Sequence, residues 1–214
     1  MIEKCVIIGA GEIQEEEKQD IIDCLQGEVL LIAADGGMRY CRLFGIKPDV
    51  CLGDFDSVDE EDAEVFASSL SVRLPREKDD TDTMAAIKYG MEKECKEFVI
   101  FGGYGGRLDH TVANLQCLLY LRRRGCHGTM RFLGGEALVL KNELLGFPAK
   151  SRGILSLFAV GGPARGVTLE GLKYPLNRAT VSEDFPIGIS NEFTGRESRI
   201  TVENGELLVV QYYT

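Results

Sequence analysis

Short, continuous apolar runs alternate with longer amphipathic segments over the first 126 residues of the chain. The apolar runs are Cys5–Ile8, Val29–Ala34, Val50–Leu52, Ser71–Leu74 and Glu97–Phe101. A run that is apolar at successive positions is typical of a strand covered on both faces, as in a parallel sheet. The segments between the runs predict helices at about 13–26, 37–45, 59–69, 82–95 and 110–124. This half therefore predicts an α/β domain with a mostly parallel sheet flanked by helices.

The pattern changes after residue 126, where short apolar stretches are broken by Gly, Pro and Asn. These stretches are Thr129–Leu133, Ala137–Lys141, Gly153–Val160, Gly166–Leu169, Arg199–Val202 and Glu206–Tyr213. Asn204-Gly205 lies between two of them and predicts a two-residue β-hairpin. We therefore expect an antiparallel β-sandwich or barrel in this half. The expected domains are residues 1–126 and 127–214, packed together without a flexible linker.

Charge and cysteine usage exclude several classes of protein. The net charge of −10 argues against a nucleic-acid-binding surface, which would be basic. The basic triplet Arg122-Arg123-Arg124 stands before Gly125, and cations in the last turn followed by glycine are a helix-stop signal. We expect no signal peptide, and no apolar run is long enough to span a membrane. Seven cysteines occur without a Cys-x-x-Cys pair, as expected for core residues of a cytoplasmic protein.

Three short acidic stretches carry the main chemical signal of the sequence. They are Gly53-Asp54-Phe55-Asp56-Ser57, Asp79-Asp80-Thr81-Asp82 and Gly106-Arg107-Leu108-Asp109-His110. If the strands before them share one sheet, their aspartates converge at its carboxyl edge, where ligands bind in open α/β folds. Clustered carboxylates repel one another and need a cation, and Mg²⁺ prefers such oxygen ligands together with substrate phosphates. The chain therefore predicts a metal-dependent phosphate-transfer enzyme.

Asp35-Gly36-Gly37 follows the second apolar run and precedes an expected helix. The glycines would let the backbone approach a ligand closely, and the helix start would offer N–H groups to an anion. An ordinary strand-to-helix turn, with Asp35 as helix N-cap, explains the same residues. Both interpretations remain open at this position.

The acidic stretches also have structural explanations. Asp54 and Asp56 are two residues apart, so in extended chain both carboxylates can reach one cation, but a surface turn would also accept them. Any one aspartate of 79–82 can be explained by capping the helix that follows. Capping explains three of them less well, because repulsion grows with each added charge. Lys78 could neutralise them or bind phosphate.

The segment 102–110 combines four glycines with Arg107, Asp109 and His110. The glycines permit close phosphate approach, although the sequence is neither a Walker A motif nor a dinucleotide fingerprint. The planar guanidinium of Arg107 suits a phosphate, and Asp109 could bind metal or accept a hydroxyl proton. His110 could instead cap or pack at the helix start. Gly9-Ala10-Gly11 fits a nucleotide-side turn or an ordinary loop.

In this order, the motifs resemble the bacterial type of thiamine pyrophosphokinase. The matching residues are Ala34-Asp35-Gly36-Gly37, Pro48-Asp49, Gly53-Asp54-Phe55-Asp56-Ser57, Lys78-Asp79 with Thr81-Asp82, Gly105-Gly106-Arg107-Leu108-Asp109-His110 with Asn114, and Ser190-Asn191-Glu192-Phe193. The resemblance covers essentially the full length. It implies an α/β nucleotide-binding domain, a C-terminal β-sandwich and a homodimer.

The resemblance implies transfer of diphosphate from ATP to the hydroxyl of thiamine, giving thiamine diphosphate and AMP. Mg²⁺ would be held by Asp54, Asp56 and Asp82, with Asp79 and Asp109 as further candidates. Arg107 would stabilise charge on the triphosphate, and Asp109 would steer or deprotonate the alcohol or bind metal. The nucleotide would also contact Asp35, Gly36, Gly37, Lys78, Gly105, Gly106 and His110. Ser190, Asn191 and Glu192 would line the pyrimidine pocket across the dimer interface.

Two other functions fit parts of this sequence. The metal and ATP residues would equally serve diphosphate transfer to another small alcohol, such as a hydroxymethyl pterin. Only Ser190–Phe193 favours thiamine as the acceptor. A non-catalytic thiamine or nucleotide sensor is a third interpretation, but a sensor has no need of so many mutually repelling aspartates.

Overall fold

The computed structural model describes residues 2–55, 69–74, 79–149 and 152–213. The chain forms two compact units. The first contains residues 1–117 and 125–133, and the second contains residues 118–124 and 134–214. No helix within the described residues is long and apolar enough to cross a membrane.

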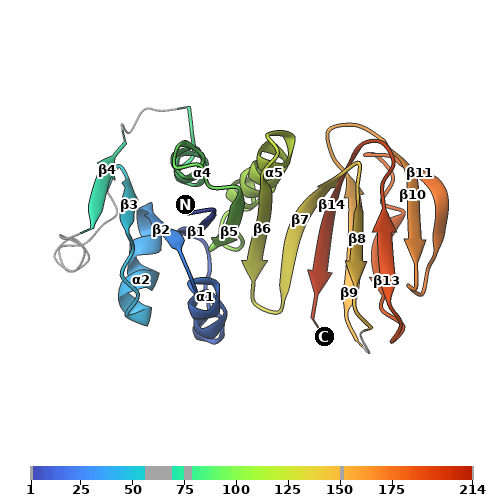
Figure 1. The fold of residues 1–214 in the computed structure, drawn as a ribbon, viewed down its shortest axis with the longest axis horizontal. Helices are drawn as coiled ribbons and strands as arrows, with labels where there is room; N and C mark the ends of the chain where they lie inside the picture. Colours follow the sequence, from blue (N-terminus) through green and yellow to red (C-terminus); the bar gives the residue numbers. More distant parts are fainter. Residues whose placement is uncertain (1, 56–68, 75–78, 150–151, 214) are drawn as a thin grey trace. The chain divides into compact units, whose positions relative to one another are not determined.

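A parallel sheet forms the centre of the first unit, in the order β6-β5-β1-β2-β3-β4 (Figure 1). Every neighbouring pair is parallel. Its middle strands are almost fully buried, as their continuous apolar runs predicted. The strands are β1 (Lys4–Ile8), β2 (Val29–Ala34), β3 (Val50–Gly53), β4 (Leu70–Arg73), β5 (Glu97–Phe101) and β6 (His127–Phe132). The predicted mostly parallel sheet is confirmed.

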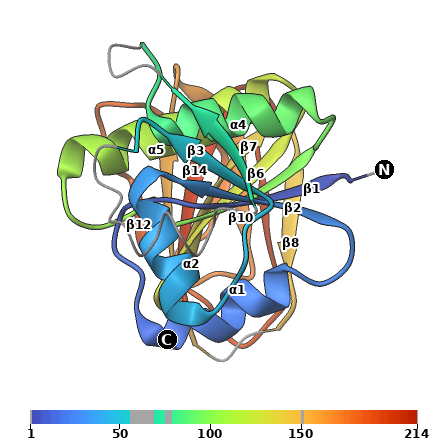
Figure 2. The ribbon, with the colours of Figure 1, turned by 90° about the vertical axis from the view of Figure 1, so that its left-hand side faces the viewer.

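Helices cover both faces of this sheet (Figure 2). α1 (Lys18–Cys24) and α2 (Met38–Phe44) lie on one face, each preceded by a 3₁₀ turn, η1 (Glu15–Glu17) and η2 (Asp35–Gly37). α4 (Asp82–Glu92) and α5 (Leu108–Arg123) lie on the other face. Ile21, Met38 and Phe44 of the first pair join β1 and β2 in one apolar core. The helix expected at 59–69 falls almost entirely outside the described residues.

The strand β6 differs from its predicted place in the antiparallel half. It pairs in parallel with β5 and lies in the first unit, although the second domain was expected to start at residue 127. The difference has a physical reason in the burial pattern of β6: Gly128 and Met130 are buried, while Thr129 between them is only half-buried. This alternation is the pattern that sequence analysis associates with antiparallel sheets.

Two antiparallel sheets make up the second unit and enclose one apolar core. One has the order β12-β9-β14-β7 and the other the order β11-β10-β13-β8. The strands are β7 (Gly135–Lys141), β8 (Leu144–Phe147), β9 (Ile154–Ala159), β10 (Ala164–Glu170), β11 (Leu176–Val181), β12 (Gly188–Glu192), β13 (Ser198–Thr201) and β14 (Glu206–Tyr212). The predicted antiparallel β-sandwich is confirmed, and β8, β11 and β12 are strands that the sequence did not predict.

The predicted hairpin at Asn204-Gly205 is wrong. The flanking strands β13 and β14 belong to different sheets and do not pair with each other. Asn204 instead bridges to Arg165, whose backbone N–H donates to the Asn204 carbonyl at 2.7 Å. Gly205 has a φ of 115° and no room for a side chain beside Ala164. The Asn-Gly pair therefore lies where the chain crosses from one sheet to the other.

Gly37 provides a test of how tightly η2 packs on the sheet. Its φ is an ordinary −63°, but an added Cβ would lie 2.0 Å from the carbonyl oxygen of Ile8. We expect Gly37→Ala to lower the free energy of unfolding by about 3 kcal/mol, measured by urea denaturation. Gly27→Ala is the control, because that site has a φ of 87° but open space, and should cost about 1 kcal/mol. Equal effects would contradict the packing argument.

Candidate active site

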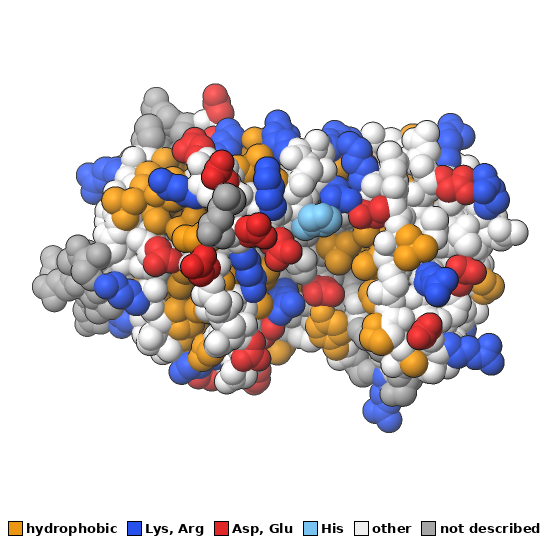
Figure 3. Space-filling view, viewed as in Figure 1, with side chains coloured by type: hydrophobic (Ala, Val, Ile, Leu, Met, Phe, Trp, Pro, Cys, Tyr) orange, Lys and Arg blue, Asp and Glu red, His pale blue; other side chains and the backbone are white. Residues whose placement is uncertain are grey.

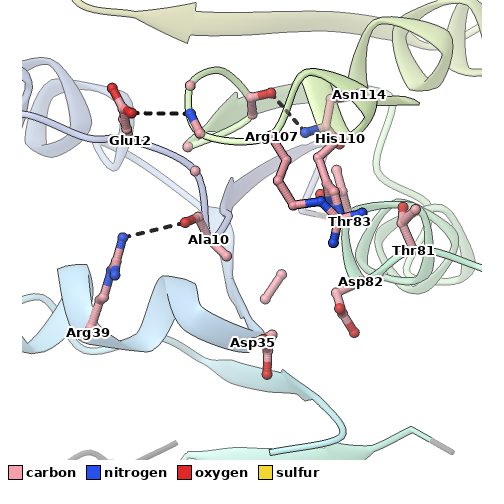
Figure 4. A pocket seen from close by; sticks show the side chains of 16 residues that line it. Ala10, Glu12, Asp35, Arg39, Thr81, Asp82, Thr83, Arg107, His110 and Asn114 are labelled. Atoms are coloured by element: carbon pink, nitrogen blue, oxygen red, sulfur yellow. Dashed lines mark hydrogen bonds between the residues drawn. The ribbon is translucent and has the colours of Figure 1, made fainter. Parts of the chain in front are cut away.

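A cavity of about 530 Å³ opens at the carboxyl ends of β1, β2 and β5 (Figure 4). This is the edge at which ligands bind in open α/β sheets. Its walls come from the loops after these three strands, from η2 and α2, and from the N-terminal turns of α4 and α5. They consist of Ala10, Gly11, Glu12, Ala34, Asp35, Arg39, Thr81, Asp82, Thr83, Gly102, Gly103, Gly105, Gly106, Arg107, His110 and Asn114.

The loops after β1 and β5 are bound together through their backbones. Gly9 N–H donates to Phe101, Gly11 N–H to Gly102 at 2.8 Å, and Glu12 N–H to Tyr104 at 2.9 Å. A Cβ on Gly11 would lie 2.5 Å from the Gly102 carbonyl, and one on Gly102 equally close to that of Gly9. These glycines are therefore required by contact between the loops. The turn at Gly9-Ala10-Gly11, which the sequence left open, forms part of the cavity wall.

Asp35 lines the cavity from the end of β2 in a strained backbone conformation. Its φ is 45°, a left-handed value that residues other than glycine adopt rarely. Gly53 lets β3 come close to it: a Cβ there would lie 3.2 Å from Asp35 Oδ1. Ala34, not Asp35, is the N-cap residue of η2. Of the two glycines predicted to approach a ligand, Gly36 faces Ala10 and Gly37 faces the backbone of β1.

The N-terminus of α4 contributes Thr81, Asp82 and Thr83 to the cavity. Thr81 is the N-cap, and its hydroxyl oxygen accepts from the Met84 N–H at 3.2 Å. Asp80 has a structural partner, because Lys88 Nζ donates to both of its carboxylate oxygens at 2.7 and 2.6 Å. Asp79 is exposed and does not line the cavity. The capping role considered for the aspartates therefore belongs to Thr81.

Arg107 and Asp109 form an exposed, forked ion pair. Arg107 Nε donates to Oδ1 of Asp109 at 3.1 Å and Nη2 donates to Oδ2 at 2.5 Å. These hydrogen bonds lower the pKa of Asp109 and raise that of Arg107. Arg107 lines the cavity (Figure 4), whereas Asp109 is outside the lining. His110 lines the cavity and is exposed.

Of the predicted metal ligands, Asp54 lies just beyond β3 and is half-buried. Asp56 and Lys78 lie outside the described residues. Within the described ranges, no three His, Cys, Asp or Glu side chains are close enough together to hold a metal ion. Phe55, next to Asp54, has a φ of 61°, so the chain leaves β3 through a turn that is strained for a bulky residue.

Arg39 and Glu12 are cavity residues that the sequence analysis missed. Arg39 Nη2 donates to the Tyr40 hydroxyl at 2.7 Å, and its guanidinium lies 4.5 Å from the centre of that ring. In the described part of the chain its polar partners are thus neutral groups, with Ala10 O at 3.5 Å as the other. The sequence feature that could have placed Arg39 in the cavity is its position four residues, about one helical turn, after Asp35. Asn114 is buried and donates to Gly103 O at 2.8 Å, which holds the glycine loop.

The predicted acceptor residues lie on β12 in the second unit. Ser190 is exposed and has a φ of 56°. Asn191 is buried, and its amide accepts from the backbone N–H groups of Tyr174 and Glu192 and donates to Tyr174 O. Glu192 forms an ion pair with Lys173 at 2.7 Å. The side chain of Asn191 therefore holds the local fold, whereas Ser190 is exposed.

Acidic and basic side chains are interspersed over the first unit around α4 (Figure 3).

The ion pair between Arg107 and Asp109 can be tested directly. We expect Arg107→Gln to raise the pKa of Asp109 toward the ordinary value of an aspartate, because the largest cause of its lowering is removed. Carbon-detected NMR titration of the carboxylates would measure this shift. Glu206 is the internal control, since Arg123 lowers its pKa and it should not change. An unchanged Asp109 would contradict the ion pair.

Comparison with known proteins identifies both parts of the chain. Residues 22–130 match the thiamin pyrophosphokinase catalytic domain, and residues 148–209 match the thiamin pyrophosphokinase vitamin B1 binding domain. Thiamine pyrophosphokinase of Bacillus subtilis (strain 168) is 29% identical over 203 residues, covering 90% of this chain and 91% of the relative.

Solved structures agree with this match at the level of the fold. The crystal structure of the Bacillus subtilis thiamine pyrophosphokinase has a TM-score of 0.87 at 24% identity, with 99% of each chain covered. Thiamin pyrophosphokinase from Candida albicans has a TM-score of 0.84 at 14% identity, covering 100% of this chain and 90% of that one. Since the two family models match these parts of the sequence, the chain belongs to the thiamin pyrophosphokinase family.

Proposed function

We propose that this protein transfers diphosphate from ATP to the hydroxyl of thiamine, giving thiamine diphosphate and AMP. The proposal depends on the cavity of the catalytic domain. This cavity contains the cations of Arg39 and Arg107 and the N-terminus of α4, together with the carboxylates of Asp35 and Asp82. Cations and free helix N–H groups bind phosphates. Membership of a family whose two domain models both match supports thiamine as the acceptor.

In this reaction the thiamine hydroxyl attacks the β-phosphorus of ATP and AMP leaves with the α–β bridging oxygen. Positioning and charge neutralisation supply most of the rate in such transfers. Arg107 has the forked geometry that grips two phosphate oxygens. Asp109 remains ionised because its pKa is lowered, so it accepts a hydrogen bond more readily than a proton. We infer that Asp109 orients the hydroxyl, with the proton released as the new O–P bond forms.

We infer that Mg²⁺ neutralises the triphosphate in this site. Mg²⁺ usually takes one or two carboxylates and completes its shell with water and phosphate oxygens. Asp82 in the cavity wall and Asp54 just beyond β3 are donors of this kind, and Asp56 stands two residues after Asp54 in the sequence. Asp109 would have to leave Arg107 to act as a ligand, and exposed Asp79 is a weaker candidate. Asp35, Gly36, Gly37, Lys78, Gly105, Gly106 and His110 remain proposed nucleotide contacts.

For the acceptor, we infer that Ser190 and its neighbours bind the pyrimidine of thiamine in a homodimer. The exposure and the strained backbone of Ser190 support a binding role, since such strain is concentrated at functional positions. Asn191 and Glu192 would act by fixing the backbone of β12. The cytoplasmic location inferred from the sequence stays a prediction.

The reaction is tested by AMP release. We expect the protein to form AMP from ATP only when both thiamine and Mg²⁺ are present, as measured by chromatography of the nucleotides. EDTA should abolish the release and added Mg²⁺ should restore it. A hydroxymethyl pterin in place of thiamine is the control for the acceptor and should give no AMP. AMP formation independent of thiamine, or undiminished in EDTA, would overturn the proposal.

The dimer is tested by sedimentation. At assay concentrations we expect the active protein to sediment as a species of twice the chain mass, because the proposed thiamine site needs residues from two subunits. Activity should fall on dilution in parallel with the dimer fraction. A fully active monomer would contradict the placement of thiamine between subunits.

A further inference from the structure

Glu12 places a negative charge in the wall of a cavity that, on the proposed function, receives a polyanion. Such a charge repels phosphate, so we looked for another role that Glu12 has in this wall. The structure shows one: Glu12 Oε1 accepts a hydrogen bond from the backbone N–H of Gly106 at 3.1 Å (Figure 4). Gly106 is the residue directly before Arg107.

The contact extends along the whole side chain of Glu12. A Cβ built on Gly105 would lie 2.7 Å from Cβ of Glu12 and 2.8 Å from its Cγ and Cδ. Glu12 thus lies flat against Gly105, while Gly106 faces open space on its own Cβ side. Both glycines have left-handed φ values, 89° and 68°. Glycine has many conformations available, so this turn needs an external contact to hold it.

The backbone of Glu12 is itself held firmly. Its N–H donates to Tyr104 O at 2.9 Å. The hydroxyl of Tyr40 donates to Gly11 O at 2.8 Å and accepts from Ile13 N–H at 3.2 Å, so it fixes the residues on both sides of Glu12. The carboxylate therefore extends from a rigid base, as a positioning group requires.

We propose that Glu12 is a positioning residue for Arg107. Its hydrogen bond to Gly106 fixes the peptide before Arg107 and so directs the guanidinium into the cavity. The proposal rests on the proposed function for its kinetic readout. In this proposal the hydrogen-bond acceptor oxygen of Glu12 orients Arg107, and the negative charge of Glu12 is not required.

Two variants separate the oxygen from the charge. Glu12→Ala removes the acceptor, and Glu12→Gln keeps an acceptor oxygen without the charge. We expect Glu12→Ala to lower kcat about tenfold, the range of one hydrogen bond, with little change in the KM for thiamine. Glu12→Gln should recover most of that loss. Glu16→Ala, at an exposed carboxylate in η1, is the matched control and should leave kcat unchanged. Equal losses in Glu12→Ala and Glu12→Gln would overturn the role of the oxygen.

A double-mutant cycle tests whether Glu12 acts through Arg107. In the Arg107→Lys background, Glu12→Ala should have little further effect on kcat, because the group that it positions is already altered. Fully additive losses would overturn the proposal.

Amide hydrogen exchange measured by NMR tests the bond without any turnover. The Gly106 amide should exchange faster in Glu12→Ala than in the wild-type protein or in Glu12→Gln. Unchanged exchange would overturn the proposed bond even if the enzyme is active. Absence of thiamine-dependent AMP release by the wild-type protein would instead overturn the proposed function.

Discussion

The backbone hydrogen bonds between the loops after β1 and β5 are the constraint on which the site depends. Adjacent parallel strands bring these loops together at the carboxyl edge of the sheet, and glycine at positions 9, 11 and 102 lets the two backbones touch. Glu12 and Arg107 can face one cavity only because this contact is made. The glycines thus act mainly on the protein itself, and their value for a bound phosphate is indirect.

Electrostatics imposes the second constraint, because an acidic protein must bind an anionic substrate. The structure pairs several of its carboxylates: Asp80 with Lys88, and Asp109 with Arg107. Arg39 differs, since the partners described for it are neutral and leave its charge available to a phosphate. Exposed pairs contribute little to stability, so the pair of Arg107 and Asp109 is better understood as a way of setting orientation.

Much of this fold was predictable from the sequence because strands buried on both faces of a parallel sheet are apolar at successive positions. β2 and β5 have the bounds that the sequence predicted. This prediction fails where burial alternates along a strand, as in β6, which the pattern assigned to the antiparallel half. It fails also at Asn204-Gly205, where a local turn preference cannot show whether the next strand returns to the same sheet or crosses to the other.

The site was predictable in its residue types but not in its contacts. Acidic motifs after strands predicted a site at the carboxyl edge of the sheet, and Asp35, Asp82 and Arg107 line the cavity there. Glu12, Arg39 and the task of Asp80 were missed because each depends on a partner distant in sequence or on helix geometry. Backbone strain was equally hidden, since a sequence shows no φ angle. Asp35, Phe55 and Ser190 all adopt left-handed conformations, at the ends of β2 and β3 and within β12. Their strain must be offset by the surrounding fold, which ties the proposed nucleotide and acceptor residues to the stability of the strands that carry them.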